Sequence, residues 1–165
     1  MKVYKNVLPE DLISHHLEQI DALKGRPIWN HSQYMWPDVI RNAIVGVVNT
    51  TEVDDSRFNV LGKYFSGYNA KRIVYQYCIW NKMSGISSHV DAKYKFAASL
   101  YLNDKWDKDW GGLLVWKDKN NWLNAVCPDQ NSMVVNDEEE EHLVTMISPV
   151  APENRMSIQI WGFEH

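Results

Sequence analysis

Two side chains that can bind a metal stand two residues apart in ISSHVDAKYKFAAS, residues 86–99. They are His89 and Asp91, and side chains at positions i and i+2 of an extended chain point to the same side. One cation can therefore reach both. Two imidazoles and one carboxylate leave open positions around a metal, as is typical of non-haem Fe(II) oxygenases. A second histidine is required, because His-x-Asp alone also occurs by chance at the end of an ordinary surface strand.

His142 is the best candidate for that second histidine, since it opens the strand-like run HLVTMIS. Thirteen residues later, Arg155 opens a further run, RMSIQIWGF. A guanidinium group binds a carboxylate through two parallel hydrogen bonds, so an arginine on a cavity wall indicates an anionic ligand. The alternative for Arg155 is an ion pair with a structural aspartate or glutamate.

The elements that must position these residues change character along the chain. Residues 1–70 show apolar residues at helical spacing, and helices are expected at 9–25, 37–47 and 54–67. From residue 72 the apolar residues alternate, and strands are expected at 72–80, 95–103, 111–118, 131–137, 142–148 and 155–163. Helices followed by many short strands predict an α+β fold built on a sandwich or barrel.

Neither face of the predicted strands has the residue composition of a solvent-exposed face. One face of each of two strands carries small, polar and aromatic residues in place of Lys and Glu. These residues are Ala97, Ser99 and Tyr101 in one strand and Arg155, Ser157, Gln159 and Trp161 in the other. Such faces suit the walls of a narrow, partly polar cavity, as in a barrel or jelly roll that holds a ligand.

Composition limits the classes of function. The chain has 165 residues, and its charged fraction of 23% and hydrophobic fraction of 45% are ordinary for one globular domain spanning 1–165. A net charge of −4 argues against nucleic-acid binding. No apolar run approaches the roughly 20 residues of a membrane span. The N-terminus lacks a signal-peptide pattern, and Cys78 and Cys127 form no CxxC motif, so a cytoplasmic protein is expected.

Five motifs in a fixed order carry a family resemblance. They are HVD (89–91), SLYLNDKW (99–106), GGLLVW (111–116), HLV (142–144) and RMSIQIW (155–161). With them the chain resembles the Fe(II)/2-oxoglutarate-dependent dioxygenase superfamily, in its prolyl 4-hydroxylase-like branch. The resemblance implies a double-stranded β-helix, a cupin-like jelly roll, over residues 72–163. It also implies that the N-terminal helices of residues 1–70 pack against the major sheet.

The resemblance assigns catalytic roles to four residues. His89, Asp91 and His142 would bind the iron. Arg155 would bind the distal carboxylate of 2-oxoglutarate. One departure concerns Trp80, which stands where the family often has a tyrosine; the polar contact of that tyrosine is in doubt here.

The resemblance also assigns residues to the cosubstrate pocket. Tyr101 would donate its hydroxyl to the carboxylate that the arginine binds. Val144 and Leu114 would line the pocket, and Ser99 would leave room for the cosubstrate because it is small. Trp161 would lie near the iron on the substrate side.

The implied reaction hydroxylates a C–H bond with Fe(II), 2-oxoglutarate and O2 and releases succinate and CO2, and ascorbate is a candidate reductant. Peptidyl proline is the leading substrate, and the expected partner is therefore a protein or peptide, with no nucleic acid or membrane. The alternatives are a free amino acid or other small molecule, a cupin-like isomerase or lyase, and a ligand-binding sandwich without activity. The sequence leaves the oligomeric state open.

Two further expectations concern the surroundings of the site. Loops at 29–37, 63–71, 81–88 and 103–111 are expected to frame the entrance, with tryptophans and tyrosines among their residues. His15 and His16 lie off the apolar stripe of the first helix, so solvent-facing positions are expected for both. Adjacent helical positions diverge by about 100°, which argues against chelation of one ion by this pair.

Overall fold

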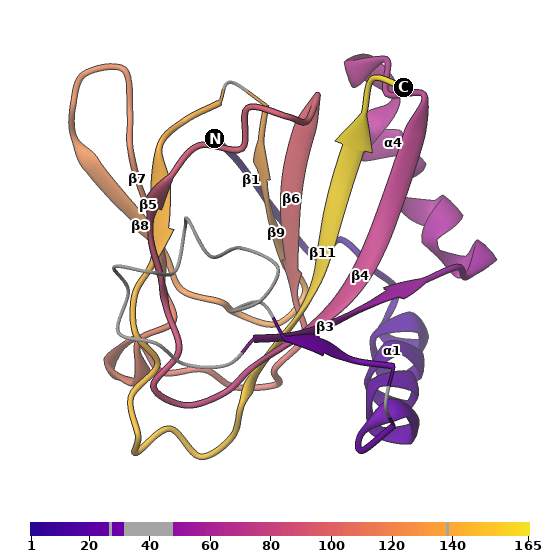
Figure 1. Ribbon diagram of the computed structural model, residues 1–165, viewed down its shortest axis with the longest axis vertical. Helices are drawn as coiled ribbons and strands as arrows, with labels where there is room; N and C mark the ends of the chain where they lie inside the picture. The colour runs from indigo at the N-terminus through magenta and orange to yellow at the C-terminus, as the bar shows by residue number, and fades with distance from the viewer. Residues whose placement is uncertain (27, 32–47, 138) are drawn as a thin grey trace.

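Two antiparallel sheets face each other and form a jelly roll (Figure 1). The computed structural model describes residues 1–26, 28–31, 48–137 and 139–165. The major sheet has the strand order β1-β9-β6-β11-β4-β3-β2, and the minor sheet has the order β5-β10-β7-β8. The strands of the major sheet are β1 (Lys2–Lys5), β2 (Asn30–His31), β3 (Val48–Val53), β4 (Arg72–Trp80), β6 (Phe96–Tyr101), β9 (Ser132–Asn136) and β11 (Arg155–Phe163). Those of the minor sheet are β5 (Ile86–His89), β7 (Leu114–Lys117), β8 (Leu123–Val126) and β10 (His142–Val144).

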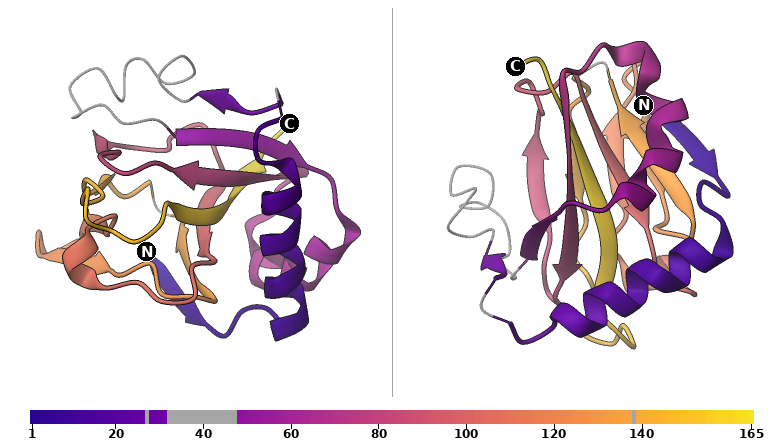
Figure 2. Two further views of the ribbon diagram at one scale, coloured as in Figure 1. Left: turned by 90° about the horizontal axis from the view of Figure 1, so that it is seen from below. Right: turned by 90° about the vertical axis from the view of Figure 1, so that its right-hand side faces the viewer.

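Helical segments cover the outer face of the major sheet, the face turned away from the minor sheet (Figures 1 and 2). They are α1 (Glu10–Leu23), η1 (Ser56–Leu61), α4 (Gly62–Phe65) and η2 (Ser66–Tyr68); a short η3 (Lys108–Trp110) precedes β7. Ile13 and Ile20 of α1 and Phe58 and Leu61 of η1 are buried against this face of the sheet. This arrangement confirms the predicted jelly roll with helical support on its major sheet.

The alternation predicted for β6 and β11 is present. Leu100 of β6 and Ile158 of β11 are fully buried in the outer core, beneath the helices. Their neighbours Ser99 and Gln159 point to the opposite face and line a cavity between the two sheets. The sheet therefore has a purely apolar face for the helices and a mixed face for a ligand.

The region before residue 71 was predicted incompletely. Besides its helical segments it contains β1, β2 and β3, which all join the major sheet and were not predicted. The predicted third helix is broken into η1, α4 and η2, and the predicted helix at 37–47 lies outside the described residues. β8 and most of β5 were also missed, and the strand expected at 142–148 ends at Val144.

Two adjacent glycines allow a close approach of two segments. Gly111 and Gly112 have φ angles of +70° and +66°, a region that L-residues with side chains rarely adopt. A Cβ atom on Gly111 would lie 2.1 Å from the carbonyl oxygen of Met146, and one on Gly112 would lie 3.0 Å from Cδ of Arg155. The GG motif therefore leaves space for the arginine side chain.

The two histidines of α1 are not solvent-facing as predicted. His16 is fully buried, its Nδ1 shares a hydrogen bond of 2.8 Å with the Tyr77 hydroxyl, and its ring stacks on Phe58 at 4.6 Å. His15 is half-buried and lies 3.0 Å from the carboxylate of Asp55. The prediction failed because the segment before η1 folds back over the helix, which the apolar stripe of the helix alone does not reveal.

Burial of His16 makes the free energy of unfolding depend on pH. Loss of hydration, and next the charge of the nearby His15, lower the pKa of His16 from 6.5 to about 4. Between pH 6.5 and about pH 4, His16 binds a proton in the unfolded chain but stays neutral in the native protein. In metal-free protein we therefore expect His16 to reduce the unfolding free energy by about 3 kcal/mol as pH falls from 6.5 to 4. Urea unfolding at several pH values should show a flatter dependence for His16→Gln, whereas His165→Gln at the chain end should match the wild type.

Candidate metal centre

The strand register places two histidines side by side. His89 ends β5 and His142 opens β10, and the two residues are direct partners in the antiparallel pair. Such partners have neighbouring side chains, and the two imidazole centroids are 4.3 Å apart. The pairing is irregular between His142 and Val144. An irregularity of this kind redirects side chains and is common beside functional sites.

Asp91 completes the group from the segment after β5. Its Oδ2 lies 3.4 Å from Nε2 of His142, and its Oδ1 lies 3.8 Å from Nε2 of His89. All three residues can offer a ligand atom to one metal ion. The structure therefore brings together the three residues that the sequence predicted, from segments about 50 positions apart in the chain.

The hydrogen bonds of both rings orient a lone pair toward Asp91. Nδ1 of His89 donates to the carbonyl of Ser87, and Nδ1 of His142 donates to the carbonyl of Glu140, each at 2.9 Å. Nε2 of each neutral ring is then free to bind a metal. Burial, and next the charge of His89, lower the pKa of His142 to about 4. His142 is therefore neutral at physiological pH, as a ligand must be.

Asn136 at the end of β9 supports this arrangement and was missed from the sequence. Its side-chain amide donates to the Glu140 carbonyl and accepts from the Glu140 N–H, both at 3.1 Å. This pair of hydrogen bonds fixes the backbone group that in turn orients His142. Asn136 stands at the polar end of the strand expected at 131–137, and no spacing in the sequence connects it with His142.

Arg155 lies at the base of the same cavity and is 1% exposed. Its guanidinium lies between two aromatic rings, with Tyr101 at 4.8 Å and Trp80 at 4.9 Å from its central carbon. Within the described residues no carboxylate forms an ion pair with this arginine, which speaks against the alternative of a structural salt bridge. Burial lowers the pKa of Arg155, although a guanidinium stays charged in proteins.

Two buried polar atoms at this base have no hydrogen-bond partner among the described residues, namely Nε of Arg155 and the hydroxyl of Tyr101. Buried polar groups are normally paired, so this pair of donors fits an anionic ligand such as a carboxylate. Trp80 is the cross-strand partner of Arg155 and contacts it through its ring. It therefore supplies a cation–π contact in place of the polar contact of a tyrosine.

The remaining predicted residues line the walls of a cavity of about 280 Å³. Leu114 and Val144 are direct partners in the minor sheet, and Ser99 faces them from β6. The Ser99 hydroxyl donates to Oε1 of Gln159 at 2.7 Å. Trp161 lies toward the other end of β11 from Arg155, and its indole N–H donates to Gln76 at 3.0 Å.

Other lining residues were missed or wrongly placed. Tyr94 packs against Trp161 with ring centroids 4.3 Å apart and the ring planes tilted by 35°, and no sequence motif marked it. The loops expected at 63–71 and 103–111 supply no lining residue among those described. Trp29 packs against the outer core, and Trp106 is buried in the inner core with its N–H bonded to the Gly111 carbonyl. The rim comes instead from residues 90–94, directly after β5.

The geometry can be compared with known families. The profile described as "2OG-Fe(II) oxygenase superfamily" matches residues 74–163, more than half of the chain. The chain belongs to this superfamily. Members use Fe(II), 2-oxoglutarate and O2, and the donors at both ends of the cavity fit the first two. No curated protein matches the sequence of this oxygenase.

Solved structures share the fold of the oxygenase. A prolyl-4-hydroxylase from Pseudomonas putida has a TM-score of 0.76 at 15% identity, with 99% of this chain and 92% of that chain covered. A Trichoplax adhaerens prolyl hydroxylase, in complex with a hypoxia inducible factor peptide fragment, has a TM-score of 0.76 at 19% identity over 99% and 83%. A Burkholderia pseudomallei member of the oxygenase family has a TM-score of 0.65 at 21% identity over 96% and 84%. Among the described residues of the oxygenase, no helix is long and apolar enough to cross a membrane.

Proposed function

We propose that this oxygenase binds Fe(II) through His89, Asp91 and His142 and hydroxylates a prolyl residue of a protein or peptide. The observation that carries the proposal is the shared cavity, which has three metal-competent side chains on one wall and, at its base, an arginine without an ion-pair partner among the described residues. A cupin-like isomerase or lyase would have no use for such a buried cation. We treat residues 1–165 as one catalytic domain, because strands of both sheets contribute to the two cores.

The protein residues have distinct tasks in this proposal. Iron and 2-oxoglutarate together supply the oxidising chemistry, with succinate and CO2 as coproducts. Arg155 and the Tyr101 hydroxyl bind the distal carboxylate of the cosubstrate with charge-assisted hydrogen bonds. Leu114 and Val144 exclude water from the space between this carboxylate and the metal. The backbone carbonyls that accept from the two histidine Nδ1 atoms keep the rings in the orientation needed for binding.

The substrate side supports a prolyl substrate through its aromatic wall. Trp161 and Tyr94 present two aromatic rings in contact at the cavity, and flat aromatic surfaces suit an apolar ring such as that of proline. Val90 at the rim is 47% exposed and extends this apolar surface outward. The two structural neighbours named as prolyl hydroxylases, one of them with a peptide bound, are consistent with this choice.

The test is a turnover assay with matched peptides. The enzyme is given Fe(II), 2-oxoglutarate and ascorbate with a pool of proline-containing peptides, the same pool with alanine for proline, or free L-proline. We expect succinate and a mass gain of about 16 Da, one oxygen atom, only with the proline peptides. Hydroxylation of free L-proline alone would support the small-molecule alternative. Metal-dependent activity that needs no 2-oxoglutarate would contradict the proposal.

A further inference from the structure

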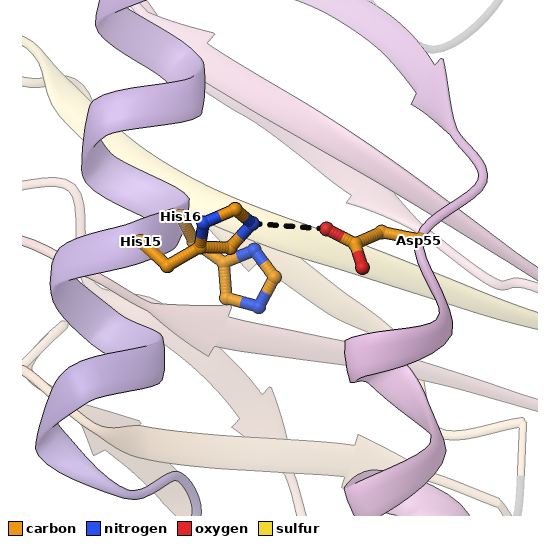
Figure 3. A group of neighbouring side chains, drawn as sticks. All are labelled: His15, His16 and Asp55. Carbon is orange, nitrogen blue, oxygen red and sulfur yellow. Dashed lines mark hydrogen bonds and ion pairs between the residues drawn. The ribbon is translucent and has the colours of Figure 1, made fainter.

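A second group of metal-competent side chains lies outside the cavity, on the outer face of the major sheet (Figure 3). His15 and His16 come from α1, and Asp55 comes from the segment that leads into η1. Their candidate ligand atoms all lie within 4.8 Å of one another. The ring of His16 turns one nitrogen toward the gap between His15 and Asp55 (Figure 3). The two adjacent helical residues thus bring ring nitrogens close to one carboxylate, although His15 bonds Asp55 and His16 bonds the Tyr77 hydroxyl.

The distances in this group fit the coordination shell of a small cation. Nε2 of His15 lies 3.0 Å from Oδ2 of Asp55. Metal–nitrogen and metal–oxygen bonds of about 2.0–2.2 Å place neighbouring ligand atoms roughly 3 Å apart. The second carboxylate oxygen, Oδ1, accepts from the backbone N–H of Arg57 at 2.9 Å. Oδ1 is therefore fixed by the backbone, whereas Oδ2 faces His15 and also lies 3.3 Å from the Arg57 guanidinium, which a metal ion would have to displace.

The hydrogen bonds of the group conflict without a cation. Nε2 of His15 faces the Asp55 carboxylate, which requires an N–H, and the Arg57 guanidinium at 3.2 Å, which requires a lone pair. One ring nitrogen cannot serve both, and the Arg57 guanidinium also lies 3.3 Å from Oδ2 of Asp55. His16 is fully buried, and its Nε2 has no partner among the described residues. A metal bound by the lone pair of His15 and the carboxylate removes the first conflict, and Arg57, which is 54% exposed, can turn to solvent.

The protonation states of Asp55 and His16 are also those that metal binding requires. The backbone N–H of Arg57 is the main cause that lowers the pKa of Asp55 to about 2, and burial lowers that of His16 to about 4. At neutral pH a cation therefore meets an ionised carboxylate and a neutral buried imidazole, so neither has to lose a proton first. The Tyr77 hydroxyl, 2.8 Å from Nδ1 of His16, lies beside the group as a further oxygen donor.

We propose that His15, His16 and Asp55 form a second metal site that takes Zn²⁺ or another late first-row divalent ion. Two imidazoles and one carboxylate are ligands of this class of ion. The site would tie α1 to η1 across the outer core and so stabilise the helical layer on the sheet. It is separate from the catalytic cavity, because Tyr77 of β4 faces the helices, whereas Cys78 and Trp80 of the same strand face the cavity.

The proposal can be tested without activity measurements. In full-length protein the double substitution His89→Ala and His142→Ala removes the first site. We expect this protein to bind one Zn²⁺ in calorimetric titration, and to bind Co²⁺ with a visible absorption band. Adding Asp55→Asn should weaken Zn²⁺ binding at least about tenfold, since loss of even an outer-shell partner costs that much. Asn caps a helix as well as Asp does, so the fold is preserved.

The matched control is Asp54→Asn, which removes the neighbouring, exposed carboxylate and should leave Zn²⁺ binding unchanged. His15→Gln is a second variant, which should weaken binding as Asp55→Asn does. In otherwise wild-type protein, Asp55→Asn should reduce bound Zn²⁺ from two ions to one and abolish part of the thermal stabilisation by Zn²⁺. Equal binding in the Asp54 and Asp55 variants would overturn the proposal and leave the group as a hydrogen-bond network.

Discussion

Asp91→Asn is expected to abolish 2-oxoglutarate turnover and to weaken metal binding by at least about 10²-fold. Loss of a second-shell partner alone typically costs 10–100-fold, and this change removes the single negative charge of the ligand group. Asparagine has the same shape, so the packing around Nε2 of His89 and His142 is preserved. Succinate production and Mn²⁺ titration measure the two effects separately.

The control for this experiment is Asp104→Asn, which neutralises an exposed carboxylate that does not line the cavity. Its activity and metal affinity should equal those of the wild type. Both variants should unfold at similar temperatures in metal-free buffer. Turnover that persists in Asp91→Asn at saturating iron would show that the carboxylate is not a required ligand, and the proposed role of the triplet HVD would be wrong.

The sequence predicted the centre of the molecule better than its periphery. Alternation along 155–163 placed Arg155 and Trp161 on one face because a strand has a strict period of two. The His89 and Asp91 pair depended only on local spacing. The proximity of His142 to His89 and Asp91 could not be predicted from local spacing. It was predicted from the order of the five motifs, and the structure explains it by the register of β10 against β5.

The failures have a common physical origin in tertiary contacts. β3 was not predicted, although Thr50, Thr51 and Val53 favour a strand, because it lies in the short gap between the helices expected at 37–47 and 54–67. His16 is buried by η1, a segment some 40 residues away, and the helix sequence carries no signal of that partner. Asn136 acts through the backbone of Glu140, and a backbone contact leaves no residue pattern to read.

Arg155→Met is the second substitution for which we expect a large effect, and its two consequences should have different signs. Hydrogen bonds to charged groups contribute about 1.5–3 kcal/mol each, so loss of a two-pronged contact should weaken 2-oxoglutarate binding by at least about 100-fold. Displacement of a fluorescent 2-oxoglutarate analogue from the Mn²⁺-loaded protein measures this loss. Metal affinity should not change, because none of the proposed ligands His89, Asp91 and His142 contacts the guanidinium.

Stability without cosubstrate should respond in the opposite direction. The buried guanidinium has no carboxylate partner among the described residues, and the rings of Trp80 and Tyr101 offset only part of its lost hydration. An apolar side chain of similar length removes that cost, as replacement of buried charges by apolar residues often does. We therefore expect Arg155→Met to unfold at an equal or higher temperature than the wild type in the absence of 2-oxoglutarate.

Saturating 2-oxoglutarate should then stabilise only the wild type, because ligand binding to the native state raises the unfolding free energy. A variant that is strongly destabilised without cosubstrate would instead mean that the arginine holds the fold together, and its unpaired Nε would no longer argue for an anion at the base of the cavity.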